Sequence, residues 1–170
     1  MKQPLIQVLL VCLCCCGLTG QATSGSLADG QNAYVVSDFA AAEMLFRPLA
    51  ERGNVTAQTY LGRMYAKGQG VAQNFKEAMS LFQSASAQGN ASAQHNLVVM
   101  YSEGRGVPQD NVRALMWENI SASKAAMTDS KNQTERIEQP DFIAMYMTRK
   151  QINKARKLSN ECMARNLKGC

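Results

Sequence analysis

The sequence predicts an all-α protein in which short helical hairpins stack into a solenoid. Fifteen residues between positions 39 and 73 recur 36 positions later, where chance would give roughly two, and such a period is typical of stacked repeats. The apolar residues of each unit also have helical spacing, as in Phe75, Ala78, Met79 and Phe82. This pattern favours a binding scaffold over an enzyme. The recurring residues of the first unit are Phe39, Ala42, Leu45, Phe46, Gly53, Asn54, Ala57, Gln58, Leu61, Met64, Tyr65, Gly68, Gly70, Val71 and Gln73.

Residues 1–22 have the layout of a secretory signal peptide. Lys2 precedes an apolar stretch from Leu5 to Leu18, and small residues follow near Gly20 and Ala22, where we expect cleavage. The rival interpretation is a membrane anchor, but about 14 apolar residues are fewer than the roughly 20 that a spanning helix needs. Lipid attachment to a cysteine of this segment is less favoured, because the preceding residues fit a lipobox poorly. We therefore expect a periplasmic or secreted protein that begins with a flexible segment, residues 23–37.

Two full units follow, residues 38–73 and 74–109, each with two amphipathic helices. Gly53 and Gly89 stand where the first helix must end and turn. Asn54 and Asn90 come next and can cap the second helix through their side-chain oxygens. The glycines have a structural role in this interpretation, because no phosphate-binding glycine motif is present. The structural glycines are Gly53, Gly68, Gly70, Gly89, Gly104 and Gly106.

A third unit, residues 110–147, begins in the same register but loses the pattern. We expect its first helix from about Asp110 to Ser123 and a degenerate second helix ending near Pro140. Residues 148–170 then form a capping helix, for which Thr148 and Gln151 supply a capping box. The ends of a solenoid need an atypical, more polar cap, and this segment supplies one.

Cys162 and Cys170 are the only cysteines outside the predicted signal peptide. In an oxidising compartment two cysteines most simply pair with each other, and closing so short a loop stabilises the fold by roughly 2.5 kcal/mol. A metal site is the weaker alternative. The sole histidine, His95, is distant in sequence, and structural zinc needs four ligands.

The order of small, apolar and glycine residues in both units resembles the Sel-one-like repeat (SLR), a relative of the tetratricopeptide repeat. The motif reads A-x-x-x-(L/F), then G-N-x-x-A-Q-x-x-L, then Y-x-x-G-x-G-V, and covers residues 38–73 and 74–109. The resemblance implies a right-handed superhelix that holds protein partners in a concave groove lined by the first helix of each hairpin. The groove positions we expect are polar or flexible residues of the first helices: Glu43, Arg47, Lys76, Met79, Gln83 and Arg113.

Two details qualify this resemblance. Val98 stands where Gly62 and the family have glycine, so we expect the helices of the second unit to lie slightly farther apart. The pair Cys162 and Cys170 is similar to the pairs of cysteine-rich family members, in which a bridge ties the two helices of a unit together.

Some relatives of the cysteine-rich type are described as β-lactamase-like or penicillin-binding, which makes a cell-wall enzyme the rival function. Ser121 and Lys124 form an S-x-x-K sequence, but the S-D-N and K-T-G motifs are absent from the chain. No Ser, Cys or acidic residue forms an evident catalytic triad with His95. We therefore predict no catalytic residue, no cofactor and no bound metal.

A third alternative rests on charge. From Lys124 onward the chain has 10 basic and 5 acidic residues, whereas residues 23–123 have 7 and 8. Such a tail is suited to an anionic envelope surface or an acidic partner. Nucleic acid is not expected as a partner, because the exported chain has no recognisable binding motif for it.

Overall fold

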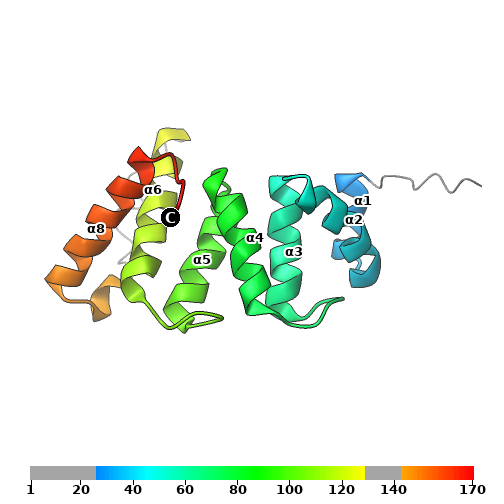
Figure 1. Ribbon diagram of the computed structural model, residues 1–170, viewed down its shortest axis with the longest axis horizontal. Helices are drawn as coiled ribbons and strands as arrows, with labels where there is room; N and C mark the ends of the chain where they lie inside the picture. The colour runs from blue at the N-terminus through cyan, green and yellow to red at the C-terminus, as the bar shows by residue number, and fades with distance from the viewer. Residues whose placement is uncertain (1–25, 129–142) are drawn as a thin grey trace, which may run out of the picture.

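The computed structural model describes residues 26–128 and 143–170, and these ranges contain helices and connecting turns without a strand. Each α-helix packs against the next described α-helix along the chain, and α8 packs on α6. The result is a single row of helices, shown in Figure 1, which confirms the all-α helical-repeat solenoid. The elements are α1 (Leu27–Val35), α2 (Phe39–Glu51), α3 (Val55–Lys67), α4 (Phe75–Ala87), α5 (Ala91–Glu103), α6 (Asn111–Thr128), the short 3₁₀ helix η1 (Ala144–Tyr146) and α8 (Arg149–Ala164).

The turn between the two helices of a hairpin is built twice in the same way. The side chain of Asn54 accepts a hydrogen bond from the backbone N–H of Ala57 at 2.9 Å, and Asn90 accepts one from Ala93 at the same distance. Such a cap satisfies a backbone donor that has no partner within the helix. The glycine before each asparagine has a positive φ, 84° in the first turn and 85° in the second. The sequence interpretation of this turn is therefore confirmed.

In a second repeated contact, the loop at the end of each unit packs against the first residue of that unit's first helix. Gly70, in the loop after α3, has a φ of +70°, and a Cβ placed on it would lie 2.6 Å from the carbonyl oxygen of Phe39. Gly106, one period later, would place its Cβ 2.6 Å from the Cβ of Phe75. Only glycine allows this approach without displacing the first residue of the unit's first helix.

The core uses the same register in all three units. Ala42, Ala78 and Ala114 are fully buried, and they are one period apart in the chain. Phe46 and Phe82 are also fully buried and equally spaced. The third unit therefore begins as the repeat predicts.

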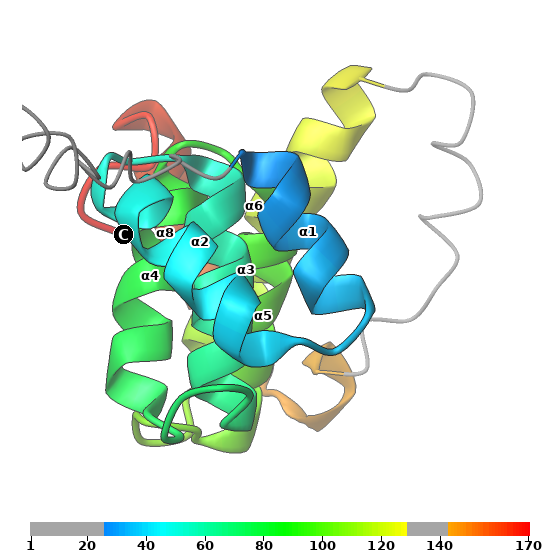
Figure 2. The same ribbon diagram turned by 90° about the vertical axis from the view of Figure 1, so that its right-hand side faces the viewer.

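The N-terminal segment corrects a sequence expectation. Residues 23–37 were expected to be flexible, but residues 27–35 form α1, which begins with a capping box between Ser26 and Asp29. Its Gly30 lies against Phe46 as Gly62 of α3 lies against Phe82, since a Cβ on either glycine would be 2.7 Å from a ring carbon. Viewed from the end of the row (Figure 2), α1 lies beside α2. It therefore takes the place of the second helix of a preceding unit.

The same geometry revises the interpretation of Val98. Gly62 faces Phe82, which belongs to the first helix of the following unit. This family position therefore sets the spacing between successive units. Val98, its counterpart in α5, bears on the spacing between the second and third units and not on the two helices of its own unit.

The third unit and the cap follow the sequence interpretation in part. Helix α6 extends to Thr128, five residues beyond the predicted end. The predicted degenerate second helix ending near Pro140 falls mostly outside the described residues, as does the predicted signal peptide. Helix α8 begins with the predicted capping box, in which the side chain of Thr148 accepts from the backbone N–H of Gln151. Within residues 26–128 and 143–170, no helix is long and apolar enough to span a membrane.

Candidate functional site

The structure distributes the predicted groove residues over three first helices, α2, α4 and α6. Lys76, Gln83 and Arg113 are exposed there. Met79 is not, because its side chain is only 6 % exposed and lies in the core beside Phe82. The groove assignment of Met79 is therefore wrong: it belongs to the apolar stripe that packs α4 onto its neighbours.

Glu43 and Arg47 form an ion pair one helical turn apart on α2. The guanidinium of Arg47 also donates to the hydroxyl of Tyr65 on α3 at 3.1 Å. The Tyr65 hydrogen bond and then the Glu43 contacts raise the pKa of Arg47 above its already high ordinary value, so this side chain stays charged. Its side chain is 46 % exposed, so the group is held in position and still reaches solvent.

A second arginine contacts the equivalent tyrosine of the next unit. Tyr101 lies one period after Tyr65, and the guanidinium carbon of Arg113 is 5.6 Å from its ring centroid, within the range of a cation–π contact. Arg113 is also 3.6 Å from the carboxylate of Asp110. A cation thus stands beside the tyrosine of each full unit, supplied by α2 in the first case and by α6 in the second.

The C-terminal loop closes one end of the row. Cys162 at the end of α8 is bonded to Cys170, with their Cα atoms 5.8 Å apart. Within the loop so closed, Leu167 is buried in the same apolar cluster as Trp117 of α6. The disulfide and this contact hold residues 165–170 against the first helix of the third unit, and the bridge lies within the cap and does not join two helices.

Two hollows flank this loop, and Gly169 and Cys170 line both. The first, here called the groove-end hollow, has a volume of about 330 Å³ and lies between α4 and α6. Its other lining residues are Gln83, Ala87, Trp117 and Leu167.

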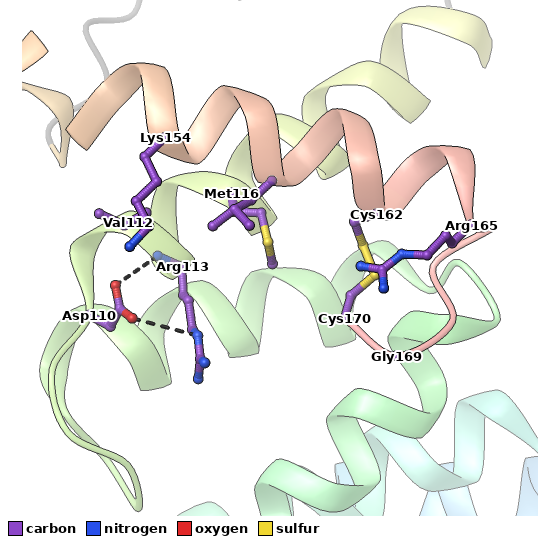
Figure 3. Close-up of a pocket in the computed structure, with 10 residues that line it drawn as sticks. Asp110, Val112, Arg113, Met116, Lys154, Cys162, Arg165, Gly169 and Cys170 are labelled. Atoms are coloured by element: carbon purple, nitrogen blue, oxygen red, sulfur yellow. Dashed lines mark hydrogen bonds and ion pairs between the residues drawn. A yellow bond between two sulfur atoms is a disulfide. The ribbon is translucent and has the colours of Figure 1, made fainter. Parts of the chain in front are cut away.

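The second, here called the cationic hollow, has a volume of about 360 Å³ and lies between α6 and α8 (Figure 3). Three positive side chains line it, and they come from separate parts of the chain. Arg113 was predicted for the groove, whereas Lys154 was singled out only as one cation of the basic tail and Arg165 was not singled out from the sequence. The excess of positive charge in the tail was the only signal for them, and it does not specify which cations meet. The lining residues are Asp110, Val112, Arg113, Met116, Lys154, Leu158, Cys162, Arg165, Gly169 and Cys170.

The candidates for catalysis are scattered. His95 is exposed on α5 beside a shallow hollow of about 420 Å³, which is also lined by Arg63, Lys67, Ala91, Ser92 and Asn96 but by no acidic residue. Ser121 is half-buried on α6, and the side chain of Lys124 lies outside the described part of the chain. Over residues 26–128 and 143–170, no three His, Cys, Asp or Glu side chains gather in a group that could hold a metal ion.

Comparison with known proteins identifies two repeats of a known kind. The Sel1 repeat profile matches residues 55–90 and 91–124, and each match runs from the second helix of one hairpin through the first helix of the next. No curated protein sequence matches the chain.

The solved structures similar to this one include two whose folds are informative. A protective antigen present in uropathogenic Escherichia coli strains, which displays an SLR fold, superposes with a TM-score of 0.69 at 25 % identity over 81 % of this chain and 29 % of its own. A Sel1 repeat protein from Oxalobacter formigenes superposes with a TM-score of 0.55 at 25 % identity over 83 % of this chain and 58 % of its own. This chain thus spans less than two thirds of either protein. Sel1 repeats build helical modules for protein–protein interaction and are typically non-catalytic. On the repeat matches, the helical row and these similarities, the chain contains two Sel1 repeats in a helical solenoid similar to the SLR fold.

Proposed function

We propose that this protein is an exported adaptor that binds a protein or an extended peptide along its first helices. The exposed polar side chains on successive first helices carry the proposal: Lys76 and Gln83 on α4 and Arg113 on α6. Of these side chains, Gln83 lies on the wall of the groove-end hollow, and Arg113 lines the cationic hollow. A ligand that follows the row would bury polar and apolar surface together, which is the usual composition of a non-obligate protein interface.

Three observations support export to the bacterial envelope. Residues 1–22 have the composition of a signal peptide. The disulfide between Cys162 and Cys170 is of the kind that persists in oxidising compartments. One of the similar structures is a protective antigen, which is consistent with a protein outside the cytoplasm.

The adaptor proposal is tested by site-specific photo-crosslinking. The mature, oxidised chain would carry a crosslinker at Lys76 on α4 or, as the control, at His95 on α5, and would be mixed with the periplasm of its own host. The expected result is one discrete protein captured from Lys76 and not from His95, which is then purified and titrated against the unmodified chain. Equal capture from both positions, or no capture from Lys76 in repeated trials, would overturn the proposal.

A second candidate function uses the exposed face of α8. Residues 143–170 contain seven basic residues and one acidic residue, Glu161. All seven cations are exposed, and within the described chain only Lys157 forms an ion pair in this segment. Arg149 and Lys150 occupy the first turn of α8, where the helix dipole disfavours cations. An anionic envelope surface would offset that cost. Salt-sensitive co-sedimentation with anionic vesicles would support this function if it is lost when the tail cations Arg149, Lys150, Lys154, Arg156 and Lys157 are neutralised. Sedimentation unchanged by neutralisation would exclude it.

A further inference from the structure

The cationic hollow combines a positive rim with an apolar floor. In Figure 3 the side chain of Lys154 extends from α8 toward Val112, Arg165 lies at the other end of the hollow beside the disulfide, and Arg113 extends from α6 on the side away from α8. Val112, Met116 and Leu158 supply the apolar part of the lining. These cations are up to 52 positions apart in the chain, so only the packing of α8 on α6 brings them together.

The charges at this rim do not balance. Asp110 is the one acidic residue that lines the hollow, and it accepts from the backbone N–H of Arg113 at 3.0 Å and pairs with the Arg113 guanidinium at 3.6 Å. That carboxylate therefore already pairs with the Arg113 side chain and caps the start of α6. Arg165 donates from Nε to the backbone oxygen of Glu161 at 3.3 Å, which orients the guanidinium without neutralising it. Lys154 has no ion pair with a described residue. The lining has a net charge of +2.

The size and lining of the hollow restrict what it can hold. A volume of about 360 Å³ admits one or two side chains but not a flat lipid surface or a folded polymer. A carboxylate on a short methylene stem matches both parts of the lining, because its oxygens can pair with Lys154 or Arg165 while its carbons cover Met116 and Leu158. We propose that the cationic hollow binds an aspartate or glutamate side chain of a partner segment, an inference that rests on the proposed adaptor function and names the chemistry of its ligand.

The C-terminal loop connects this site to the first helices. Gly169 and Cys170 form a wall of the cationic hollow and a wall of the groove-end hollow, which also contains Gln83 of α4. A partner segment that lies along α4 would thus reach the C-terminal loop at the groove-end hollow. Its acidic side chain would then enter the cationic hollow on the other side of the same loop. The disulfide holds this shared wall, because it fixes Cys170 to the end of α8.

The test measures binding of a fluorescein-labelled hexaglutamate peptide by fluorescence anisotropy at about 0.15 M ionic strength, where the Debye length is about 8 Å, with labelled hexaglutamine as the uncharged comparison. Three variants remove one cation each from the hollow: Arg113→Gln, Lys154→Gln and Arg165→Gln. Two controls, Lys150→Gln and Arg156→Gln, remove the same charge from exposed positions of α8 that do not line it.

We expect the oxidised protein to bind hexaglutamate and not hexaglutamine. Each hollow variant should weaken binding about two- to fivefold, the range measured for exposed charge pairs, and the controls should change it less because distant charges are screened. Reduction of the disulfide should weaken binding as much as the hollow variants do, since the wall is released. The inference is overturned if the controls lose as much as the hollow variants, which would indicate a net-charge effect, or if the unmodified protein does not bind hexaglutamate.

Failure of the carboxylate site can be distinguished from failure of the adaptor proposal. If a partner crosslinks from Lys76 and its affinity is unaffected by Lys154→Gln and Arg165→Gln, which lie outside the first helices, the adaptor stands and the carboxylate site fails. If hexaglutamate binds in the hollow but no partner is captured from Lys76, the site stands and the adaptor proposal fails.

Discussion

The close approach of Gly70 to Phe39 predicts a large loss of stability in Gly70→Ala. The left-handed backbone of Gly70, at φ +70°, costs an alanine roughly 1–2 kcal/mol. The added Cβ would also lie 2.6 Å from the Phe39 carbonyl oxygen and 2.7 Å from its carbon. Backbone atoms cannot rotate away, so this overpacking adds about 1–3 kcal/mol. We expect a total loss of about 3 kcal/mol in the free energy of unfolding.

Gly53→Ala is the matched control, because it separates the cost of a left-handed backbone from the cost of a steric clash with a neighbouring residue. Gly53 has a similar φ of +84°, but a Cβ placed on it would have nothing within 4 Å. The unfolding free energy of this control should therefore fall only by the cost of the left-handed backbone, roughly 1–2 kcal/mol. For a chain of this length each kcal/mol lowers the melting temperature by roughly 2–4 °C, so we expect about 9 °C for Gly70→Ala and about 4 °C for Gly53→Ala.

Thermal unfolding followed by circular dichroism at 222 nm measures both shifts. Gly106→Ala should match Gly70→Ala, because its Cβ would meet Phe75 at 2.6 Å. Equal shifts for Gly70→Ala and Gly53→Ala would refute the reasoning that each unit closes onto its own first helix.

Three further predictions concern the caps and the disulfide. Asn54→Ala and Asn90→Ala should each cost about 1 kcal/mol of unfolding free energy in urea, and the double variant should lose close to the sum; a loss in only one of them would contradict the equivalence of the two turns. Reducing the bond between Cys162 and Cys170 should cost about 2.5 kcal/mol, and unchanged urea unfolding in reductant would argue against its role in the cap. Hydrogen bonds from Ser26 lower the pKa of Asp29, so the capping box of α1 contributes stability above the ordinary carboxyl pKa and loses it as the pH falls below about 4. Amide exchange in α1 should then accelerate relative to α3, and equal acceleration in both helices would contradict a local effect.

Periodicity specified most of the fold, because the repeated positions are also the buried positions. Ala42, Ala78 and Ala114 stand in one register and are all inaccessible to solvent, so packing and sequence report the same pattern. Helix α1 was missed because it precedes the first full copy of the 36-residue pattern and has few of its residues. The combination of Ser26 with Asp29, a cap and its reciprocal partner, was the local signal that could have identified it.

The candidate site was less predictable for two physical reasons. Met79 was assigned to the groove for its flexibility, although its spacing from Phe75 and Phe82 already placed it on the apolar stripe, and burial followed the stripe. Arg113 and Arg165 are brought together by the packing of α8 on α6. A contact between distant segments has no local periodicity, so the sequence indicated the charge of the tail but not the hollow.

The most direct test of recognition through the first helices compares a lysine on a first helix with a lysine on a second helix. Lys76→Glu changes an exposed cation on α4, a first helix, and Lys67→Glu makes the same change at the end of α3, a second helix. Isothermal titration of both variants against the purified partner measures the effect of each. We predict that Lys76→Glu weakens binding at least about fivefold, as expected when attraction becomes repulsion at an interface, while Lys67→Glu leaves it within error. An equal effect of the two substitutions, or a larger one at Lys67, would contradict recognition through the first helices.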